Sequence, residues 1–359
     1  MALICGLVGV PGSGKTVIFN AITAAGATGF GGTETNRMVV NVPDSRLDKL
    51  AAMYNPRKLV PATLDILDIP GLKKAQGSSR GSQLLANLKN VEALLHVVRC
   101  FEDPNVPFEY DTINPVRDVE NIDLEMMAAD AVTLENKIER VSKKLKAGDN
   151  KDAIMESAHC KKVYDAIQQG IPARKQDLSK AEKASVYECN LVSLKPVLYI
   201  ANVKSMADSG NKHVAAIKEI ATAENAGIIV VCGRDEADIS QLDKADQKEF
   251  LKELGLEESS MERLLKAAYC LLGLISFFTV GEDEVRAWTC RAGDKAPVAA
   301  GKIHTDMEKG FIRMEVMHYD DLLALGSESA LLKAGKKRVE SREYEVKDGD
   351  IVTVLFNKP

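Results

Sequence analysis

Residues 9–16 have the sequence Gly-Val-Pro-Gly-Ser-Gly-Lys-Thr, a full match to the phosphate-binding pattern G-x-x-x-x-G-K-S/T. The apolar run 3–8 before it carries no charge, as expected of a buried parallel strand, and a helix can follow. The glycines let backbone N–H groups curl around phosphate oxygens, and the helix N-terminus adds positive charge. Lys15 would reach the β- and γ-phosphates, and the Thr16 hydroxyl would bind Mg²⁺. The motif therefore predicts a nucleoside triphosphate site.

The composition is typical of a globular protein of two or three domains, with 359 residues, 45% apolar and 28% charged. A net charge of −5 means that any nucleic-acid contact must be a local patch. The seven cysteines form no C-x-x-C pair, which favours reduced thiols and a cytoplasmic location. The chain enters a strand directly, so we expect no signal peptide, and its most apolar uncharged run, 267–281, is too short to span a membrane.

Apolar strands alternate with helical patterns in the first half and again near residue 200, which predicts an α/β fold with a doubly wound, mostly parallel sheet. The candidate strands are 64–68, 93–98, 197–200 and 228–231. From about residue 276 the pattern changes to short strands and turns, which predicts a small α+β module with strands at 277–280, 285–289, 311–316 and 351–356.

Apolar residues recur in steps of four and three from Met127 to Leu145, which predicts a coiled-coil helix, with a second helix returning over 152–167. Lysines near the hairpin tip fit a solvated face better than a phosphate-binding stripe; they are Lys143, Lys144, Lys146, Lys161 and Lys162. The expected division is a nucleotide-binding domain over 1–115 and 190–275, a helical insertion over 116–189 and a C-terminal module over 276–359.

Asp68-Ile69-Pro70-Gly71 follows a strand about 50 residues after the phosphate motif. The Asp68 carboxylate would hold a Mg²⁺-bound water, and the Gly71 amide would reach the γ-phosphate. The glycine-rich stretch 29–35 is either a plain surface loop or a first switch, in which Thr33 or Thr35 would bind Mg²⁺.

Base selection is expected from Asn202, which follows the strand 197–200 and can bond a purine ring. In GTPases an Asp three positions later accepts both N–H donors of the guanine edge, and here that position is Ser205. Losing a charged hydrogen bond costs about 1.5–3 kcal/mol, so adenine becomes competitive.

With these motifs the chain resembles the YchF family of Obg-like ATPases, which are translation-factor-type P-loop NTPases. The stretches that carry the resemblance are 9–16, 43–47, 68–72, 96–102, 199–203, 300–306, 308–313 and 346–350. The resemblance implies a G domain interrupted by a coiled-coil domain and followed by a TGS domain of β-grasp type. It also implies ATP preferred over GTP, Mg²⁺, and a ribosome or ribosomal subunit as partner. The helical and TGS-like domains are then the candidates for contact with RNA, and no membrane is involved.

The chain departs from the family where Ser205 replaces the usual acid and where Phe108 takes the position of a His proposed to assist hydrolysis. Leu72 stands where many GTPases carry a water-orienting Gln, a substitution that the family shares. No catalytic residue is therefore assigned, and we expect slow intrinsic turnover that needs a partner or a K⁺-like cation. A binding module with vestigial hydrolysis and a GTPase remain the alternatives.

The predicted site combines these elements. The metal ligands are Thr16, Asp68 and Thr33, and Phe101 is placed against the adenine by the resemblance. The predicted nucleotide contacts are Pro11, Gly12, Ser13, Gly14, Lys15, Thr16, Gly71, Phe101, Asn202, Val203 and Cys232.

Overall fold

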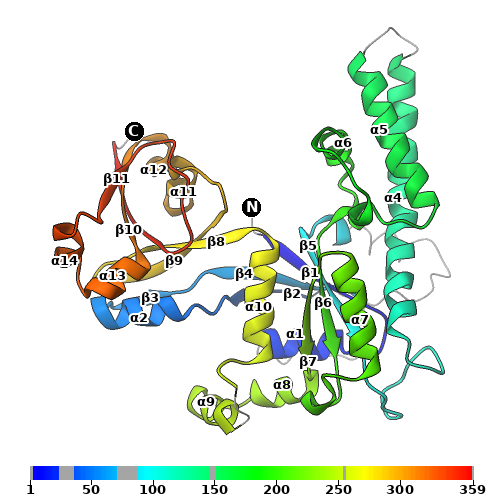
Figure 1. The fold of residues 1–359 in the computed structure, drawn as a ribbon, viewed down its shortest axis with the longest axis horizontal. Helices are drawn as coiled ribbons and strands as arrows, with labels where there is room; N and C mark the ends of the chain where they lie inside the picture. The colour runs from blue at the N-terminus through cyan, green and yellow to red at the C-terminus, as the bar shows by residue number, and fades with distance from the viewer. Residues whose placement is uncertain (1–2, 24–35, 71–86, 146–150, 254–255, 358–359) are drawn as a thin grey trace. The chain divides into compact units, whose positions relative to one another are not determined.

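The computed structural model describes residues 3–23, 36–70, 87–145, 151–253 and 256–357 (Figure 1). The chain divides into two compact units. The first comprises Met1–Met38 and Asp65–Leu264, and the second comprises Val39–Leu64 and Leu265–Pro359.

A six-stranded sheet with the order β2-β4-β1-β5-β6-β7 is the core of the first unit. Its strands are β1 Ile4–Val8, β2 Asn36–Asn41, β4 Thr63–Asp68, β5 Ala93–Arg99, β6 Val197–Asn202 and β7 Gly227–Val231. The pairs from β4 through β7 are all parallel, so the predicted strands and the α/β fold class are confirmed. Because the carboxyl ends of parallel strands share one edge, the residues that follow these strands meet there.

Helices surround this sheet and continue into an insertion. They are α1 Lys15–Thr23, α4 Pro115–Leu145, α5 Lys151–Gln168, α6 Lys180–Val186, α7 Lys212–Ala223, α8 Gly233–Ile239, α9 Lys244–Glu253 and α10 Ser260–Leu271. One apolar core joins the sheet to α4 and α7, with Val98, Tyr199, Ile122 and Ile217 among its buried members.

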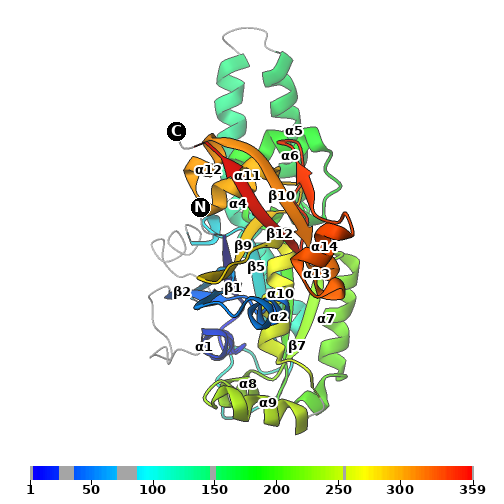
Figure 2. The same ribbon diagram turned by 90° about the vertical axis from the view of Figure 1, so that its left-hand side faces the viewer.

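The insertion is a helical hairpin in which α4 and α5 lie side by side (Figures 1 and 2). Its core contains Met127 and Leu134 of α4 with Val163 and Ile167 of α5, which confirms the predicted apolar seam. Three of the lysines have acidic partners: Lys143 bonds Glu139 at 2.8 Å, Lys161 bonds Asp165 at 3.0 Å, and Lys162 bonds Glu182 at 2.7 Å. These pairs support a solvated face, and Lys146 lies outside the described residues.

A buried ion network attaches the hairpin to the sheet. Arg174 lies in a short 3₁₀ turn, Ala173–Lys175, and its Nη2 is 2.7 Å from a carboxylate oxygen of Asp123 on α4. The Arg174 Nε is 2.9 Å from Glu224, which follows α7, and Glu224 also accepts from the Tyr199 hydroxyl at 3.0 Å. Since these charged side chains are almost fully buried, breaking one pair would leave an uncompensated charge.

The second unit contains a six-stranded sheet with the order β11-β10-β12-β8-β9-β3. Its strands are β3 Lys58–Val60, β8 Leu274–Thr279, β9 Glu284–Arg291, β10 Phe311–His318, β11 Arg338–Glu340 and β12 Asp350–Phe356. The helices of this unit are α2 Ser45–Tyr54, α11 Ala296–Ile303, α12 Thr305–Lys309, α13 Tyr319–Leu325 and α14 Glu328–Lys333. The four predicted C-terminal strands are present. The edge strand β3, parallel to β9, comes from a much earlier part of the chain and was not predicted.

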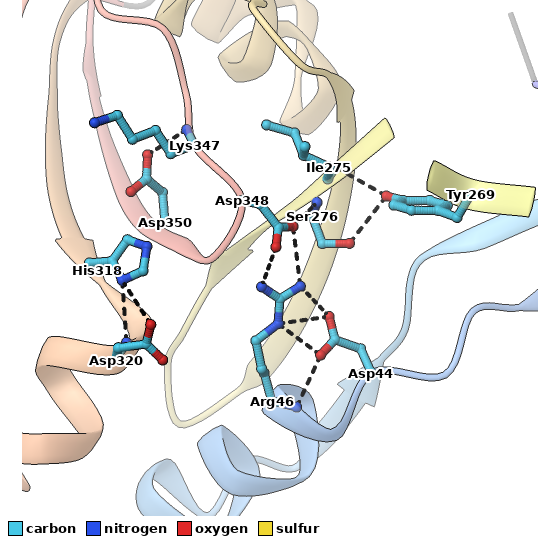
Figure 3. Close-up of polar contacts among 10 residues, drawn as sticks. All are labelled: Asp44, Arg46, Tyr269, Ile275, Ser276, His318, Asp320, Lys347, Asp348 and Asp350. Atoms are coloured by element: carbon cyan, nitrogen blue, oxygen red, sulfur yellow. Dashed lines mark hydrogen bonds and ion pairs between the residues drawn. The ribbon is translucent and has the colours of Figure 1, made fainter. Parts of the chain in front are cut away.

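Arg46 joins this early segment to the C-terminal turn 346–350 (Figure 3). Its Nη1 and Nη2 lie 2.7 and 3.2 Å from the two carboxylate oxygens of Asp348. The same guanidinium bonds Asp44 through Nε at 2.9 Å and Nη2 at 2.8 Å, and it lies 5.1 Å from the centre of the Phe278 ring. Asp348 is fixed in turn by the backbone N–H of Ser276 at 2.9 Å. Two stretches that carried the family resemblance therefore meet in one ion pair.

No helix in the described ranges is both long enough and apolar enough to cross a bilayer. All seven cysteines are described, and all are free thiols. Six of them are buried, and Cys270 alone is exposed.

We expect Arg46 and Asp348 to be energetically coupled, because they make a two-point contact and both partners are held by further bonds, although the Asp348 side chain is 51% exposed. In a double-mutant cycle of Arg46→Met and Asp348→Asn, thermal unfolding should give a coupling of about 1 kcal/mol. The matched control is the pair Arg57 and Asp283, which is 3.4 Å apart but 85% and 90% exposed, and which should show no coupling. Equal coupling in both pairs would contradict the structural role of Arg46.

Candidate nucleotide site

The phosphate loop lies between β1 and α1, where the sequence placed it. Gly9, Gly12 and Gly14 have φ angles of 148°, 78° and 95°, a region that residues with a Cβ rarely adopt. A Cβ at Gly14 would also lie 2.2 Å from the amide nitrogen of Asn202. The loop conformation therefore needs glycine for both its backbone angles and its close packing.

Lys15 is 7% exposed and folds back along the loop. Its ammonium donates to the carbonyl of Gly9 at 2.7 Å and to that of Val10 at 3.3 Å. Burial lowers the pKa of Lys15 to about 8, and the charge of Asp68 opposes that shift. The free protein thus holds a buried cation at the loop whose charge is only partly compensated.

Asn202 holds the next part of the loop. At the end of β6 its side-chain NH₂ donates to the carbonyl of Ser13 at 2.9 Å, and its side-chain oxygen accepts from the N–H of Gly233 at 3.1 Å. One amide donor remains for a base, so binding a purine and bracing the loop are compatible roles.

The N–H groups of the loop are left available by this arrangement. Among the described residues, no backbone carbonyl accepts from the N–H of Gly14, Lys15 or Thr16. The first N–H groups of a helix have no partner within the helix and carry partial positive charge. Together with the Lys15 ammonium they form a site suited to phosphate oxygens.

Thr16 and Asp68 lie together beside the loop. The Thr16 hydroxyl donates to Asp68 Oδ2 at 3.4 Å. Asp68 Oδ1 is buried, and no described residue bonds it. Burial raises the pKa of the Asp68 carboxyl, an effect that the charge of Lys15 opposes.

A hydroxyl and a carboxylate with spare acceptor capacity fit Mg²⁺, which prefers oxygen ligands and keeps several waters and phosphate oxygens. Thr16 would bind the ion directly, and Asp68 would hold one of its waters. The ion would neutralise phosphate charge there. The other predicted contacts of this part, Thr33 and Gly71, lie outside the described residues, as do Thr35 and Leu72.

The predicted base contacts follow three neighbouring strands. Phe101 comes after β5 and is half-buried, Asn202 and Val203 end and follow β6, and Cys232 follows β7. Cys232 donates its thiol to the carbonyl of Lys204 at 3.1 Å, and burial raises its pKa to about 11, which favours the protonated thiol. The structure therefore brings the phosphate and base contacts to one edge of the sheet.

Arg99 was missed by sequence reasoning. It ends β5, is 2% exposed, and donates to the carbonyl of Gly12 at 3.2 Å. A charged residue closing an otherwise uncharged buried strand was the signal that could have identified it. Phe108, noted only as a departure from the family, packs with its ring 4.7 Å from the Arg99 guanidinium carbon.

A strand–loop–helix phosphate site with Thr16, and with Asp68 on the neighbouring strand, defines a P-loop nucleotide-binding protein. Residues 4–137 match a family model described as 50S ribosome-binding GTPase. Residues 274–357 match the C-terminal model of the YchF family, described as a protein of unknown function (DUF933).

Full-length relatives identify the family. The "Ribosome-binding ATPase YchF" of Bacillus subtilis (strain 168) is 44% identical, over 99% of this chain and 100% of the relative, and that of Escherichia coli O157:H7 is 43% identical over the same shares. The solved "Structure of the Schizosaccharomyces pombe YchF GTPase" is 34% identical, with a TM-score of 0.87 over 98% of this chain and 97% of that one. The chain belongs to the YchF family, as the resemblance indicated.

We expect Mg·ATP binding at pH 8 to take up about half a proton, because a pKa near 8 leaves Lys15 half-protonated before phosphate raises that pKa. At pH 6.5 Lys15 is already charged, so this uptake should vanish. Calorimetry in buffers of different ionisation enthalpy measures it. Lys15→Arg, which stays charged, is the control, and uptake that persists in this variant would contradict the assignment.

We expect Asn202→Asp to destabilise the protein by about 1–3 kcal/mol and to weaken nucleotide binding, because a carboxylate oxygen would face the Ser13 carbonyl without a donor. Thermal unfolding and nucleotide titration measure the two effects. Asn190→Asp is the matched control, since the Asn190 side-chain amide also donates to a carbonyl, that of Lys89 at 2.8 Å, but at an exposed position. Comparable losses in the two variants would remove the special role of Asn202.

Proposed function

We propose that this protein binds purine nucleoside triphosphates with Mg²⁺, prefers ATP to GTP, and hydrolyses ATP slowly as a ribosome-associated regulatory switch in the cytoplasm. The observation that carries the proposal is the phosphate loop with free N–H groups, a buried Lys15 and the Thr16–Asp68 pair. The relatives named as ribosome-binding ATPases support the reaction and the partner.

The preference for ATP rests on Ser205. Its hydroxyl accepts from the N–H of Ala207 at 3.3 Å, so it serves as the cap of a short turn. A serine cannot offer the carboxylate that pairs with two N–H donors of guanine. Phe101, Asn202, Val203 and Cys232 are the residues we assign to the base.

We expect slow turnover because the two positions that could orient the attacking water, 108 and 72, carry apolar side chains. Phe108, in the position of the His that the family resemblance points to, has no hydrogen-bonding atom and packs on Arg99. Leu72 likewise has none. We propose that a ribosomal partner or a monovalent cation supplies the missing water-orienting group.

We also propose three domains. Residues 1–115 with 190–275 form the nucleotide-binding domain, 116–189 form the helical insertion, and 276–359 form a TGS-like domain.

One titration tests the nucleotide preference. With Mg²⁺ present, ATP and GTP should compete for one site, and ATP should bind more tightly, because guanine lacks the charged hydrogen bond, worth about 1.5–3 kcal/mol, that favours it in GTPases. Lys15→Ala should weaken both by roughly a hundredfold, the upper end of the same range. Equal affinities would favour the GTPase alternative.

Hydrolysis is then measured with and without purified ribosomes. We expect slow release of phosphate by the isolated protein and a faster rate with ribosomes. Negligible turnover under both conditions, together with ribosome binding that Lys15→Ala abolishes, would favour a binding module with vestigial hydrolysis. Fast turnover by the isolated protein would contradict the proposal.

A further inference from the structure

Arg99 is a buried cation without a carboxylate partner. It is among the largest fully buried side chains of the described residues, and no acidic residue in that part of the chain forms an ion pair with it. Burial lowers its pKa, and the charges of Asp103 and Asp118 oppose that shift. Burying a charge is costly unless it is bonded and compensated, so the bonds that Arg99 makes indicate why it is there.

Among the described residues, the guanidinium donates to backbone carbonyls alone. Nη1 donates to Gly12 at 3.2 Å and Val106 at 3.3 Å, Nε donates to Phe101 at 3.2 Å, and Nη2 donates to Asp103 at 3.1 Å. Two aromatic rings pack against the guanidinium. The ring centres of Phe101 and Phe108 lie 4.4 and 4.7 Å from the guanidinium carbon. One side chain therefore holds the phosphate loop and the segment 101–108 together.

The contact between loop and segment is close. A Cβ at Gly12 would lie 2.4 Å from the carbonyl oxygen of Pro107 and 3.3 Å from the Phe108 ring. A change in the Gly12 backbone must therefore move the segment or be resisted by it. The Arg99 bond to the Gly12 carbonyl fixes the direction of that oxygen.

The same segment continues to the first turns of the helical hairpin. Phe108 meets Tyr110 edge to face at 5.7 Å, and the Arg117 guanidinium lies 3.7 Å above the Tyr110 ring. Asn121 donates to the Tyr110 hydroxyl at 2.9 Å, and both Arg117 and Asn121 belong to α4. An unbroken series of contacts thus runs from the phosphate loop to the root of the hairpin.

We propose that Arg99 is a positioning residue that fixes the phosphate loop and couples triphosphate binding to the root of the hairpin through residues 101–110. A triphosphate at the loop would add its negative charge to that of Asp103 and Asp118 around the Arg99 guanidinium. This inference rests on the nucleotide binding proposed above.

The test compares Arg99→Lys with Arg174→Lys, a second buried arginine of the same unit that bonds Asp123 and Glu224 and has no bond to the phosphate loop. Lysine keeps the charge but loses the planar stacking and most of the bonds. Arg99→Lys should raise the Kd for Mg·ATP roughly tenfold, the loss of one to two good hydrogen bonds. Arg174→Lys should lower the Tm and leave that Kd unchanged.

Hydrogen exchange measures the nucleotide-dependent protection of backbone amides, which replacing a purely structural arginine would not change. Mg·ATP should increase the protection of residues 101–126 in the wild-type protein, and this increase should be absent in Arg99→Lys but present in Arg174→Lys. Phe108→Leu, a milder change that removes one stacked ring, should reduce the increase and keeps the test available if Arg99→Lys does not fold.

The outcomes separate the two proposals. A wild-type protein that does not bind Mg·ATP refutes the proposed function itself. Wild-type binding without added protection of 101–126, or a folded Arg99→Lys with wild-type Kd and protection, overturns the role of Arg99 alone. If both arginine variants weaken binding equally, the effect is general destabilisation and the inference is also overturned.

Discussion

The site depends on one constraint: the carbonyl groups of the phosphate loop must be bonded by donors of the protein so that its N–H groups remain available to a ligand. Three buried side chains meet it. Lys15 bonds the carbonyls of Gly9 and Val10, Arg99 bonds that of Gly12, and Asn202 bonds that of Ser13. They come from α1, β5 and β6, so the loop conformation is stabilised by several elements at this edge of the sheet and not by the octapeptide alone. Since each donor would be costly to bury unbonded, the loop and the strands stabilise each other.

Local spacing was enough to place Lys15, Thr16 and Asp68 near one another, because each lies at a fixed offset from a strand end; their roles toward nucleotide and metal stay predictions. It could not predict the brace on Gly12, which lies 87 residues from Arg99 in the chain. The ion pair of Arg46 and Asp348 spans 302 residues, and both stretches had been noted without any sign that they meet. Short β runs bounded by turn signals likewise identified the C-terminal strands but not β3, whose three residues are too few to stand out. What the sequence missed are long-range contacts, which no local periodicity encodes.

Phe108 shows how a departure from a family pattern can change the role of the residue at that position. A polar side chain there could orient a water, whereas a phenyl ring can only pack. In this chain the rings of Phe108 and Phe101 both pack against the Arg99 guanidinium. These two contacts restrict the position from which the guanidinium donates to the Gly12 carbonyl. The position thus contributes to the geometry of the binding site, while the orientation of the attacking water is left to other groups.

The chain path gives the second unit a direct covalent connection to the metal side of the site. β4 begins at Thr63 in the second unit and ends at Asp68 in the first, and β2 crosses the same boundary in the other direction along the chain. The residues between them, Val39–Leu64, belong to the second unit, where β3 pairs with β9 and Arg46 bonds Asp348. They are therefore a structured part of that unit and not a free linker. The strand that ends at Asp68 is therefore continuous with a segment that is bonded into the C-terminal sheet.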